Sequence, residues 1–405
     1  MKCRTCSNTD LKKFLSLGTT PLANNFLTEQ QLQQEERFPL ELCFCDTCKL
    51  VQLSHVVPPE VMFKNYVYVT STTNTFKVHF TAMAKELTDE FKLQKTSLAV
   101  DIGSNDGLLL KGFQQWGVQT IGVEPAGNIA VIAEKDGVET INDFFNEAAV
   151  RQIIARKGHA DIITANNVFA HINDISDVIR NVDLLLKPEG VFVIEIQYLG
   201  DMIEKMTFDN VYHEHLSYFT LTSLEQFCKR HQMEIFKVKR VDSHGGSLRV
   251  FMKRPQSLRS IDASVKDLWG YEQRLGVNDF NTYRTFAEKV YGTKEKFVGF
   301  MKRIKSEGKT VYGYGAPAKG NTLLNFCDIG KDYITYVIDD NPLKQNLFTP
   351  GTHILVVSSK ILDEKKPDYV LILAWNFADE ILKKTQKYAA QGVRFIVPLP
   401  EPRII

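Results

Sequence analysis

The chain has 405 residues, enough for two or three domains, and its content of 44% hydrophobic and 24% charged residues is typical of a globular enzyme. Its 49 basic and 48 acidic residues give a net charge of +1, so no basic surface favours nucleic acid or a membrane as a partner. The start, MKCRTC, lacks the apolar core of a signal peptide, and no uncharged apolar run could span a bilayer. We therefore expect a soluble, cytoplasmic protein.

Five of the seven cysteines lie in the first 48 residues, and four of them form two CxxC pairs. In a reducing cytosol such clusters favour metal binding over disulfides. Four thiolates on two tight turns form the closed tetrahedral shell of structural Zn²⁺. The predicted ligands are Cys3, Cys6, Cys45 and Cys48. Cys43 belongs to neither CxxC pair and is not expected to be a ligand. We predict a zinc-ribbon-like domain over residues 1–75.

Residues 76–255 alternate β-rich runs with helix-like segments, which is typical of a parallel sheet with helical crossovers. The expected strands are Ser97–Ile102, Thr120–Glu124, Asp161–Ala165 and Val191–Ile196. Two further runs, Glu234–Val241 and Gly246–Lys253, follow each other without a helix between them. They predict an antiparallel hairpin at one edge of the sheet.

The first of these strands ends in a glycine-rich turn, Asp101–Gly107 (DIGSNDG). A dinucleotide fold would have Gly-x-Gly-x-x-Gly there, but Asn105 replaces the second glycine. The negative charges of Asp101 and Asp106 are unfavourable beside a diphosphate and acceptable beside a sulfonium cation. Glu124 ends the next strand, where a carboxylate can accept both ribose hydroxyls of a nucleoside. The combination favours S-adenosylmethionine over NAD, although each carboxylate alone is also typical of a solvated strand end.

Other polar residues follow the later strands, where ligands approach the carboxyl edge of an α/β sheet. Asp143 and Phe144 lie in the NDFF run and could frame an adenine, while Asn166 and Asn167 follow the expected strand Asp161–Ala165. Ordinary polar loop residues are the alternative. From the residues alone, the predicted donor site consists of Asp101, Gly103, Ser104, Asn105, Gly107, Glu124, Asp143, Phe144, Asn166 and Asn167.

The run Tyr212–Phe219 (YHEHLSYF) gathers four neighbouring titratable side chains. On an extended chain, Tyr212 and Glu214 would face one side and His213 and His215 the other. A metal site would need a third ligand, which the spacing does not supply, and a surface loop is a further alternative. We favour acid–base catalysis, because histidine titrates near neutrality and a neighbouring carboxylate or phenol can orient it.

Residues 256–305 are charged and helix-like, and we expect them to bridge two domains. The alternation then restarts in residues 306–405, which predicts a second, smaller α/β domain. Its expected strands are Thr310–Gly313, Ile334–Ile338, Tyr369–Leu373 and Val393–Val397. Its first turn, GYGAPAKGNTLLN (313–325), combines glycines, Lys319 and a helix start, as phosphate-binding turns do. The order of residues is not that of a Walker motif, and packing of the domain onto the sheet is the alternative.

In combination these motifs resemble the sugar C-methyltransferases of deoxysugar biosynthesis, which act on nucleotide-linked 4-keto-6-deoxyhexoses. The resemblance covers nearly the whole chain. It rests on the two CxxC pairs, DIGSNDG with Glu124-Pro125, YHEHLSYF, His244–Arg249 (HGGSLR) and GYGAPAKGNTLLN. It implies a zinc-binding domain, a class I S-adenosylmethionine-dependent methyltransferase domain of the Rossmann-like kind, and a smaller Rossmann-like α/β domain. The sugar nucleotide would lie in the cleft between domains.

The resemblance also implies roles for single residues. His215 matches the base that removes the proton beside the ketone, and the neighbouring Tyr212, His213 and Glu214 complete the expected catalytic group.

The segment Tyr66–Ser71 (YVYVTS) resembles a family segment that closes over the methyl donor, although it departs from the commoner tyrosine-serine-serine sequence. It adds Tyr68 and Ser71 to the donor site, as the motif with Glu124 adds Pro125. The expected substrate-binding residues are Tyr218, His244, Tyr314, Lys319 and Asn321.

The expected function is transfer of a methyl group from S-adenosylmethionine to a carbon, C3, of a dTDP-linked 4-keto-6-deoxy sugar, with no metal needed in that step. One alternative is an NAD-dependent sugar-nucleotide dehydrogenase, which Asn105 disfavours. Another is a zinc-ribbon nucleic-acid-binding protein, which the neutral charge and the apolar flank FPLELCFCDTCKLVQL disfavour. The resemblance favours dTDP and C3, but the residues themselves leave the exact sugar, its nucleotide, the methylated ring carbon and the oligomeric state open, a monomer included.

Overall fold

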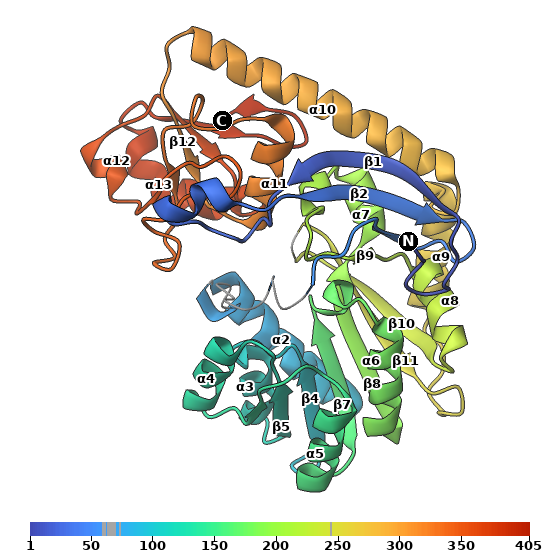
Figure 1. Cartoon of the computed structure of the whole chain (residues 1–405). Coiled ribbons are helices and arrows are strands. Elements are labelled where there is room, and N and C mark those ends of the chain that lie inside the picture. Colours follow the sequence, from blue (N-terminus) through green and yellow to red (C-terminus); the bar gives the residue numbers. More distant parts are fainter. Residues whose placement is uncertain (59–61, 63–69, 73, 244) are drawn as a thin grey trace.

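A computed structural model of the chain arranges it around three sheets (Figure 1). The structure describes residues 1–58, 62, 70–72, 74–243 and 245–405. The sheets have four, seven and six strands and follow one another along the chain, except that the first sheet also contains residues 217–218. Within the described ranges, no helix is long and apolar enough to cross a membrane.

The first sheet is antiparallel and takes one strand from far along the chain. Its strands are β1 Leu11–Thr20, β2 Phe38–Cys45, β3 Val51–Leu53 and β9 Ser217–Tyr218, with the 3-10 helix η1 Glu29–Gln34 between β1 and β2. They lie in the order β1-β2-β3-β9, and Val51 pairs with Tyr218 across the last two. Strand β9 directly follows the Tyr-His-Glu-His run, so the cysteine-rich region and that run share one sheet.

The second sheet confirms the expected parallel sheet and edge hairpin, in the order β10-β11-β8-β7-β4-β5-β6. Its strands are β4 Leu98–Ile102, β5 Gln119–Val123, β6 Thr140–Ile141, β7 Ala160–Asn166, β8 Leu186–Gln197, β10 Glu234–Val241 and β11 Ser247–Lys253. The helices of this region are α2 Asn74–Phe91, α3 Leu108–Gln115, α4 Gly127–Lys135, α5 Glu147–Lys157, α6 Ile175–Leu185, α7 Leu199–Glu204 and α8 Leu221–Arg230, with the 3-10 turns η2 Thr70–Thr72, η3 Phe169–His171 and η4 Phe208–Asn210.

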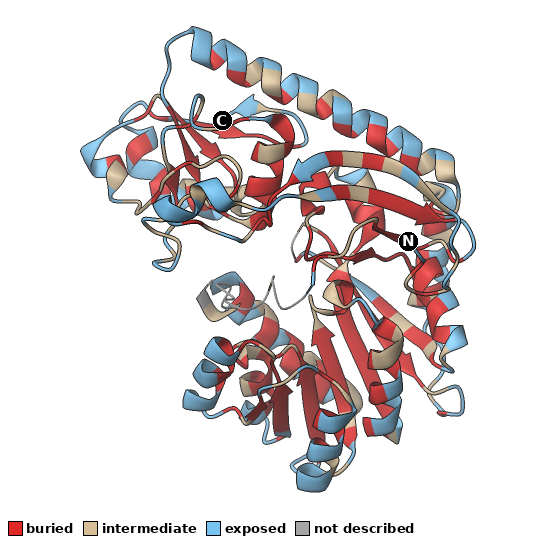
Figure 2. Cartoon of the chain, in the orientation of Figure 1, coloured by how far each residue is buried: buried red, intermediate tan, exposed pale blue. Residues whose placement is uncertain are grey.

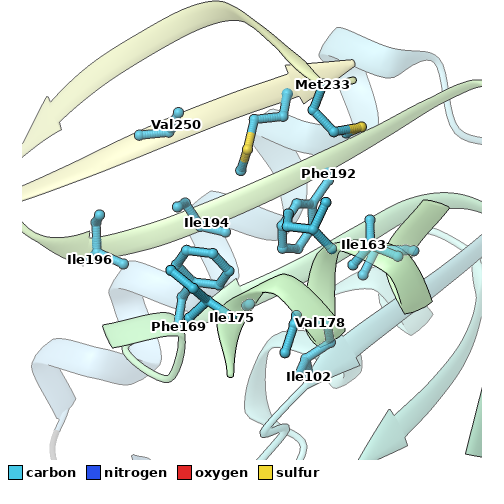
Figure 3. Close-up of a cluster of buried hydrophobic side chains, with 14 of the residues drawn as sticks. Ile102, Ile163, Phe169, Ile175, Val178, Phe192, Ile194, Ile196, Met233 and Val250 are labelled. Atoms are coloured by element: carbon cyan, nitrogen blue, oxygen red, sulfur yellow. The ribbon is translucent and has the colours of Figure 1, made fainter. Parts of the chain in front are cut away.

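Alternate residues of the central strands enter two separate apolar cores, so both faces of this sheet are covered (Figure 2). Val100 and Ile163 pack with α5, α6 and α8, while Ala99 and Ile162 pack with α2 and α3. Figure 3 shows part of the first core, with Phe192 among its labelled side chains. Burial on both faces explains the near-continuous hydrophobic runs of these strands.

The third sheet follows two bridging helices along the chain. Its strand order is β14-β13-β12-β15-β16-β17, and the strands are parallel except for the last pair. Its strands are β12 Val311–Tyr314, β13 Val337–Ile338, β14 Val356–Val357, β15 Tyr369–Ile372, β16 Arg394–Val397 and β17 Arg403–Ile404. The helices are α9 Ala263–Leu275, α10 Phe280–Ser306, α11 Ala318–Cys327, α12 Ile361–Glu364 and α13 Ala378–Ala389, with the 3-10 turn η5 Trp375–Phe377.

One apolar core joins the N-terminal sheet, the segment from α7 to β9, helix α10 and the C-terminal sheet. Figure 1 shows α10 running past β1 towards the C-terminal sheet. Tyr283 on α10 packs against Phe14 and Phe44, with ring centroids 5.2 and 4.8 Å apart. The chain therefore places the Tyr-His-Glu-His run where its three sheets meet.

Candidate active site and metal centre

The cysteines of the two CxxC pairs converge at one point. Their Sγ atoms lie within 4.8 Å of one another, with 3.3 Å between Cys3 and Cys48 and 3.5 Å between Cys6 and Cys45. Thiolates about 2.3 Å from a tetrahedral Zn²⁺ lie about 3.8 Å apart, so the group fits that ion. Cys43 is buried but lies outside the group, as predicted. Four thiolates close the shell and leave no position for a substrate, which suits a structural zinc site.

The turn after β4 is sharp because three of its residues have left-handed backbones. Gly103, Asn105 and Gly107 have φ values of 65°, 49° and 75°. A Cβ at Gly103 would lie 2.8 Å from Val168, so a larger residue would collide there. Asparagine tolerates this conformation better than most side chains. Asn105 therefore keeps the turn tight where a dinucleotide motif would have glycine.

Glu124 follows β5 and ties its carboxylate to this turn. It accepts hydrogen bonds from the backbone N–H groups of Asn105 at 2.9 Å and Ala126 at 2.8 Å. Burial raises the pKa of Glu124. A carboxylate has about four lone-pair positions, so two hydrogen bonds leave acceptors for the ribose hydroxyls of a nucleoside.

Asp101 is the last residue but one of β4 and lies beside a polar side chain, Asn166, with an unused acceptor. It accepts hydrogen bonds from the Thr164 hydroxyl at 2.6 Å and from Nδ2 of Asn166 at 3.3 Å. Burial raises the pKa of Asp101 to about 7. Within the described residues, the buried Oδ1 of Asn166 has no hydrogen-bond partner. Such acceptors fit a ligand rich in N–H and O–H groups, as the amino-acid and ribose parts of S-adenosylmethionine are.

Most other residues predicted for the donor site follow strands β4 to β7, whose carboxyl ends meet at the same edge. The described ones are Ser71, Ser104, Pro125, Asp143, Phe144 and Asn167. Ser71 comes instead from η2, and its N–H donates to Asp106 at 3.0 Å. Phe144 is 47% exposed, so its ring is available to a ligand. Tyr68 lies outside the described residues.

Replacing Glu124 by alanine is expected to weaken donor binding roughly 10-fold or more, because each lost hydrogen bond to a charged group costs about 1.5–3 kcal/mol. Titration calorimetry with S-adenosylmethionine measures this directly. Exposed Glu134 on α4 provides a matched control, and Glu134→Ala should bind the donor as the unmodified chain does. Unchanged affinity in Glu124→Ala would remove this carboxylate from the donor site.

The Tyr-His-Glu-His run is a turn, so the expectation of an extended chain is wrong. The N–H of His215 donates to the carbonyl of Tyr212 at 2.9 Å, which closes the turn between η4 and β9. The rings of Tyr212 and His215 lie together, with centroids 3.9 Å apart. The chain must reverse here to bring β9 onto β3. Tyrosine and the second histidine thereby become neighbours, instead of pointing to opposite sides.

His215 is buried and held in one tautomer. Its Nδ1 lies 2.7 Å from the carbonyl oxygen of Asn210. A carbonyl oxygen only accepts, so Nδ1 carries the hydrogen and Nε2 is the basic atom of the neutral ring. The ring of His171, from η3, lies 4.9 Å away between centroids. The geometry suits a general base with a fixed orientation.

His171 was not among the residues predicted for the site. Burial lowers its pKa to about 4, so it is neutral near pH 7 and brings no positive charge next to His215. The available signal was its position in the loop that begins with Asn166 and Asn167, after β7. A lone histidine five residues past a strand is too common a pattern to single it out.

The other two members of the run anchor the turn on the N-terminal region. Nε2 of His213 donates to the carbonyl of Phe38 at 3.2 Å, and burial lowers the pKa of His213 to about 4. Glu214 accepts a hydrogen bond from Nδ2 of Asn24 at 2.6 Å. Burial raises the pKa of Glu214 to about 7. Of the four predicted catalytic residues, Tyr212 and His215 thus pack ring against ring. His213 and Glu214 instead hold the turn against the N-terminal region.

The raised pKa of Glu214 predicts a pH dependence of stability. Between its ordinary value of 4.5 and about 7 the folded chain binds more protons than the unfolded one, so the free energy of unfolding falls as pH rises through this window. Glu214→Gln removes this contribution, which is about 3 kcal/mol. Denaturant unfolding at pH 5 and 7.5 measures it, since Asp101 titrates in both proteins and cancels. An identical pH dependence would contradict the assignment.

Lys319 lies at the start of α11, where a phosphate-binding residue was predicted, but it is buried among side chains from two regions. Its ammonium lies over the ring of Trp375, 5.8 Å from the centroid, and faces Asp209. Trp375 donates from Nε1 to Asp209 at 2.6 Å. Burial lowers the pKa of Lys319 and raises that of Asp209. This group packs the C-terminal sheet domain onto η4, and substrate binding by Lys319 stays a prediction.

The other predicted substrate residues are spread over the same junction. Tyr218 donates to the carbonyl of Asn210 at 3.5 Å, the group that also orients His215. Asn321 donates to the carbonyl of Ala23 at 2.8 Å, and Tyr314 donates to Asp340 at 3.3 Å. His244 lies outside the described residues. Tyr218 and Asn321 thus border the turn that carries the Tyr-His-Glu-His run, whereas Tyr314 belongs to the core of the C-terminal domain.

Comparison with known proteins identifies three consecutive regions. Residues 3–63 match a zinc binding domain, residues 78–238 a methyltransferase domain, and residues 242–400 a C-methyltransferase C-terminal domain. The chain is 37% identical to C-methyltransferase NovU of Streptomyces niveus over 405 residues, which covers 100% of this chain and 96% of that protein.

Two other matches cover only part of the chain. A ubiquinone biosynthesis O-methyltransferase of Rhodopseudomonas palustris is 31% identical over 96 residues, 24% of this chain and 38% of that protein. A crystal structure of an S-adenosylmethionine-dependent methyltransferase from Anabaena variabilis covers 44% of this chain and 85% of that one, at 16% identity and a TM-score of 0.37, and carries no part of the assignment. On the full-length match, the chain belongs to the family of zinc-binding, S-adenosylmethionine-dependent C-methyltransferases.

Proposed function

We propose that the chain methylates the carbon next to the ketone of a nucleotide-linked 4-keto-6-deoxy sugar, with dTDP as the nucleotide and C3 as the carbon. The observation that carries this proposal is the buried His215, whose tautomer is fixed by Asn210 and whose ring lies against Tyr212. A carbon beside a ketone is weakly acidic, so its methylation needs a positioned base. The motif resemblance supplies the sugar, the nucleotide and the ring position.

In the proposed reaction Nε2 of His215 takes the proton from the substrate carbon. The hydrogen bond from Nδ1 to the Asn210 carbonyl stabilises the resulting imidazolium, because that carbonyl is a fixed acceptor. Tyr212 holds the ring in place, and the neutral His171 adds no charge that would oppose protonation. When bound, S-adenosylmethionine supplies the electrophilic methyl group.

The two ligands would enter from different regions. The turn Asp101–Gly107, Glu124 and Asn166 would hold the donor at the carboxyl edge of the central sheet. The sugar nucleotide would lie between the methyltransferase domain, residues 76–255, and the C-terminal domain, residues 306–405. Residues 1–75 would form the zinc-binding domain and residues 256–305 the bridge. A soluble cytoplasmic enzyme with a small-molecule substrate fits the near-neutral charge.

The decisive experiment incubates the protein with methyl-labelled S-adenosylmethionine and a panel of nucleotide-linked sugars with and without a 4-keto group. We expect label on carbon only with the keto sugars, and carbon NMR of the product then gives the ring position. Label on oxygen or nitrogen, or equal labelling of sugars without the ketone, would contradict the proposal.

A further inference from the structure

The first CxxC turn reaches the catalytic turn through the side chain between its cysteines. Arg4 donates from Nη1 to the carbonyl oxygens of Leu216 at 2.9 Å and Leu53 at 3.2 Å, and from Nε to Oδ1 of Asn173 at 3.2 Å. Leu216 directly follows His215. Across the part of the chain that the structure describes, these acceptors of Arg4 are neutral. Arg4 is half-buried, and a guanidinium withdrawn from water is normally compensated by negative charge.

The zinc site supplies the missing compensation. Four thiolates around one divalent ion carry net negative charge, and Arg4 stands between two of them in the sequence, Cys3 and Cys6. Its side chain extends from the metal-site turn, and its guanidinium donates to the backbone carbonyls of Leu53 and Leu216. An arginine fork can serve several carbonyls at once, which a lysine ammonium does less well.

The backbone of Leu216, the residue after His215, is held from three directions. The carbonyl of Leu216 accepts from Arg4 and from the N–H of Leu53 at 3.0 Å, and its N–H donates to the carbonyl of Ala170 at 2.9 Å. Ala170 precedes His171, whose ring lies against His215. The first CxxC turn, strand β3 and turn η3 thus meet at the backbone of one residue, Leu216, next to the proposed base.

A second connection keeps the zinc turn aligned with β9. Buried Gln52 accepts a hydrogen bond from the N–H of Arg4 at 2.9 Å and donates to the carbonyl of Lys2 at 3.1 Å. Gln52 is also the β3 partner of Ser217 in the register of the sheet. A shift of the zinc turn would therefore move both contacts together.

We propose that Arg4 is a positioning residue for the methyl transfer, which holds His215 in place by fixing the Leu216 carbonyl to the zinc-bound turn. This inference rests on the proposed role of His215. It gives the zinc site, which takes no part in the chemistry, a direct effect on the reaction. A displacement of about 1 Å at a reacting group can cost about 100-fold in rate.

The test compares Arg4→Met with Arg230→Met in the full chain. Arg230, at the end of α8, donates to the carbonyl of Thr5 at 3.2 Å and so contacts the same zinc turn, but it has no recorded contact with residues 212–218 within the described chain. We expect Arg4→Met to keep about one zinc per chain, to lower kcat by about 10- to 100-fold, and to change KM little. Arg230→Met should keep both values near those of the unmodified protein.

Amide hydrogen exchange of the segment 213–218 provides a readout that does not depend on activity. It should accelerate in Arg4→Met and stay unchanged in Arg230→Met. Arg4→Lys, which keeps the charge, should recover part of the rate and serves as the test if Arg4→Met does not fold. Equal losses in Arg4→Met and Arg230→Met, accompanied by zinc loss, would show a general role in the zinc turn and overturn the proposal.

Two further results would also overturn it: unchanged exchange and kcat in Arg4→Met, or faster exchange with unchanged kcat. The parallel variant His215→Asn separates this from failure of the proposed function. If His215→Asn is inactive, such a result refutes the role of Arg4 alone. If His215→Asn is active, the base has been assigned wrongly.

Discussion

Replacement of His215 by asparagine is expected to lower turnover by about 10²–10⁴-fold, the usual contribution of a positioned acid or base. Asparagine keeps an N–H that can donate to the Asn210 carbonyl, but it has no basic nitrogen. Affinity for the donor and the sugar nucleotide should change little, because neither is expected to depend on the basicity of this ring. The effect should therefore appear in kcat and not in KM.

Deuterium exchange separates proton removal from methyl transfer. Without the donor, the unmodified protein should exchange the proton beside the substrate ketone with solvent, and His215→Asn should not exceed the uncatalysed rate. His231→Asn is a matched control, because His231 is a partly buried histidine at the end of α8 that contacts Ser176 instead of the catalytic turn. Exchange and methylation near the unmodified rate in His215→Asn would shift the search for the base to His213 or Tyr212.

Local patterns in the sequence were sufficient for the central sheet and the zinc ligands. The strands that end at Ile102 and Val123 are buried on both faces, so each is a mainly apolar run that can be recognised without knowledge of its neighbours. The CxxC spacing likewise fixes two ligands within one turn. The spacing does not show that the two turns lie together, but a tetrahedral zinc site needs four ligands, and the two turns supply four thiolates.

The arrangement of the catalytic turn could not be read from the sequence, because its cause lies 160 residues upstream. Strand β9 has two residues, Ser217–Tyr218, too few to show any periodicity, and it exists because β3 offers a free edge. That pairing forces the reversal at Tyr212 and His215. The short strands β14 and β17 were missed for the same reason.

The role of Arg249 could not be predicted from the sequence. The family resemblance includes this residue in the HGGSLR motif but does not say what its side chain does. Arg249 donates to Glu195 at 2.8 and 3.1 Å, and both side chains are buried. Burial alone would raise the pKa of Glu195, but hydrogen bonds from His79 and Arg249 outweigh it and hold this pKa at about 2. The pair links strands β8 and β11 to helix α2 through His79, so a motif next to the site serves the scaffold.

Loss of one zinc ligand should have the largest effect on stability. In Cys45→Ser a fully buried thiolate becomes a hydroxyl, and structural zinc sites contribute about 10–16 kcal/mol in isolated zinc-finger peptides at pH 7. Metal analysis should find well below one zinc per chain after dialysis, and the thermal midpoint should fall. Cys43→Ser is the matched control, because it is equally buried on the same strand but outside the metal group. It should keep its zinc and lose only about 1–3 kcal/mol for the buried hydroxyl.

Zinc loss should also reduce methyl transfer, although the ion does not touch the proposed reaction. The zinc turn carries Arg4, which holds the carbonyl of Leu216, and strand β3 pairs with β9 directly after His215. If the first CxxC turn becomes disordered, the backbone of Leu216 therefore loses its hydrogen bond from Arg4. In Cys45→Ser we expect kcat to fall at temperatures where the rest of the chain stays folded, and added donor should not restore it. Full zinc content in fresh Cys45→Ser would refute the four-thiolate site, and full activity after zinc loss would refute its link to His215.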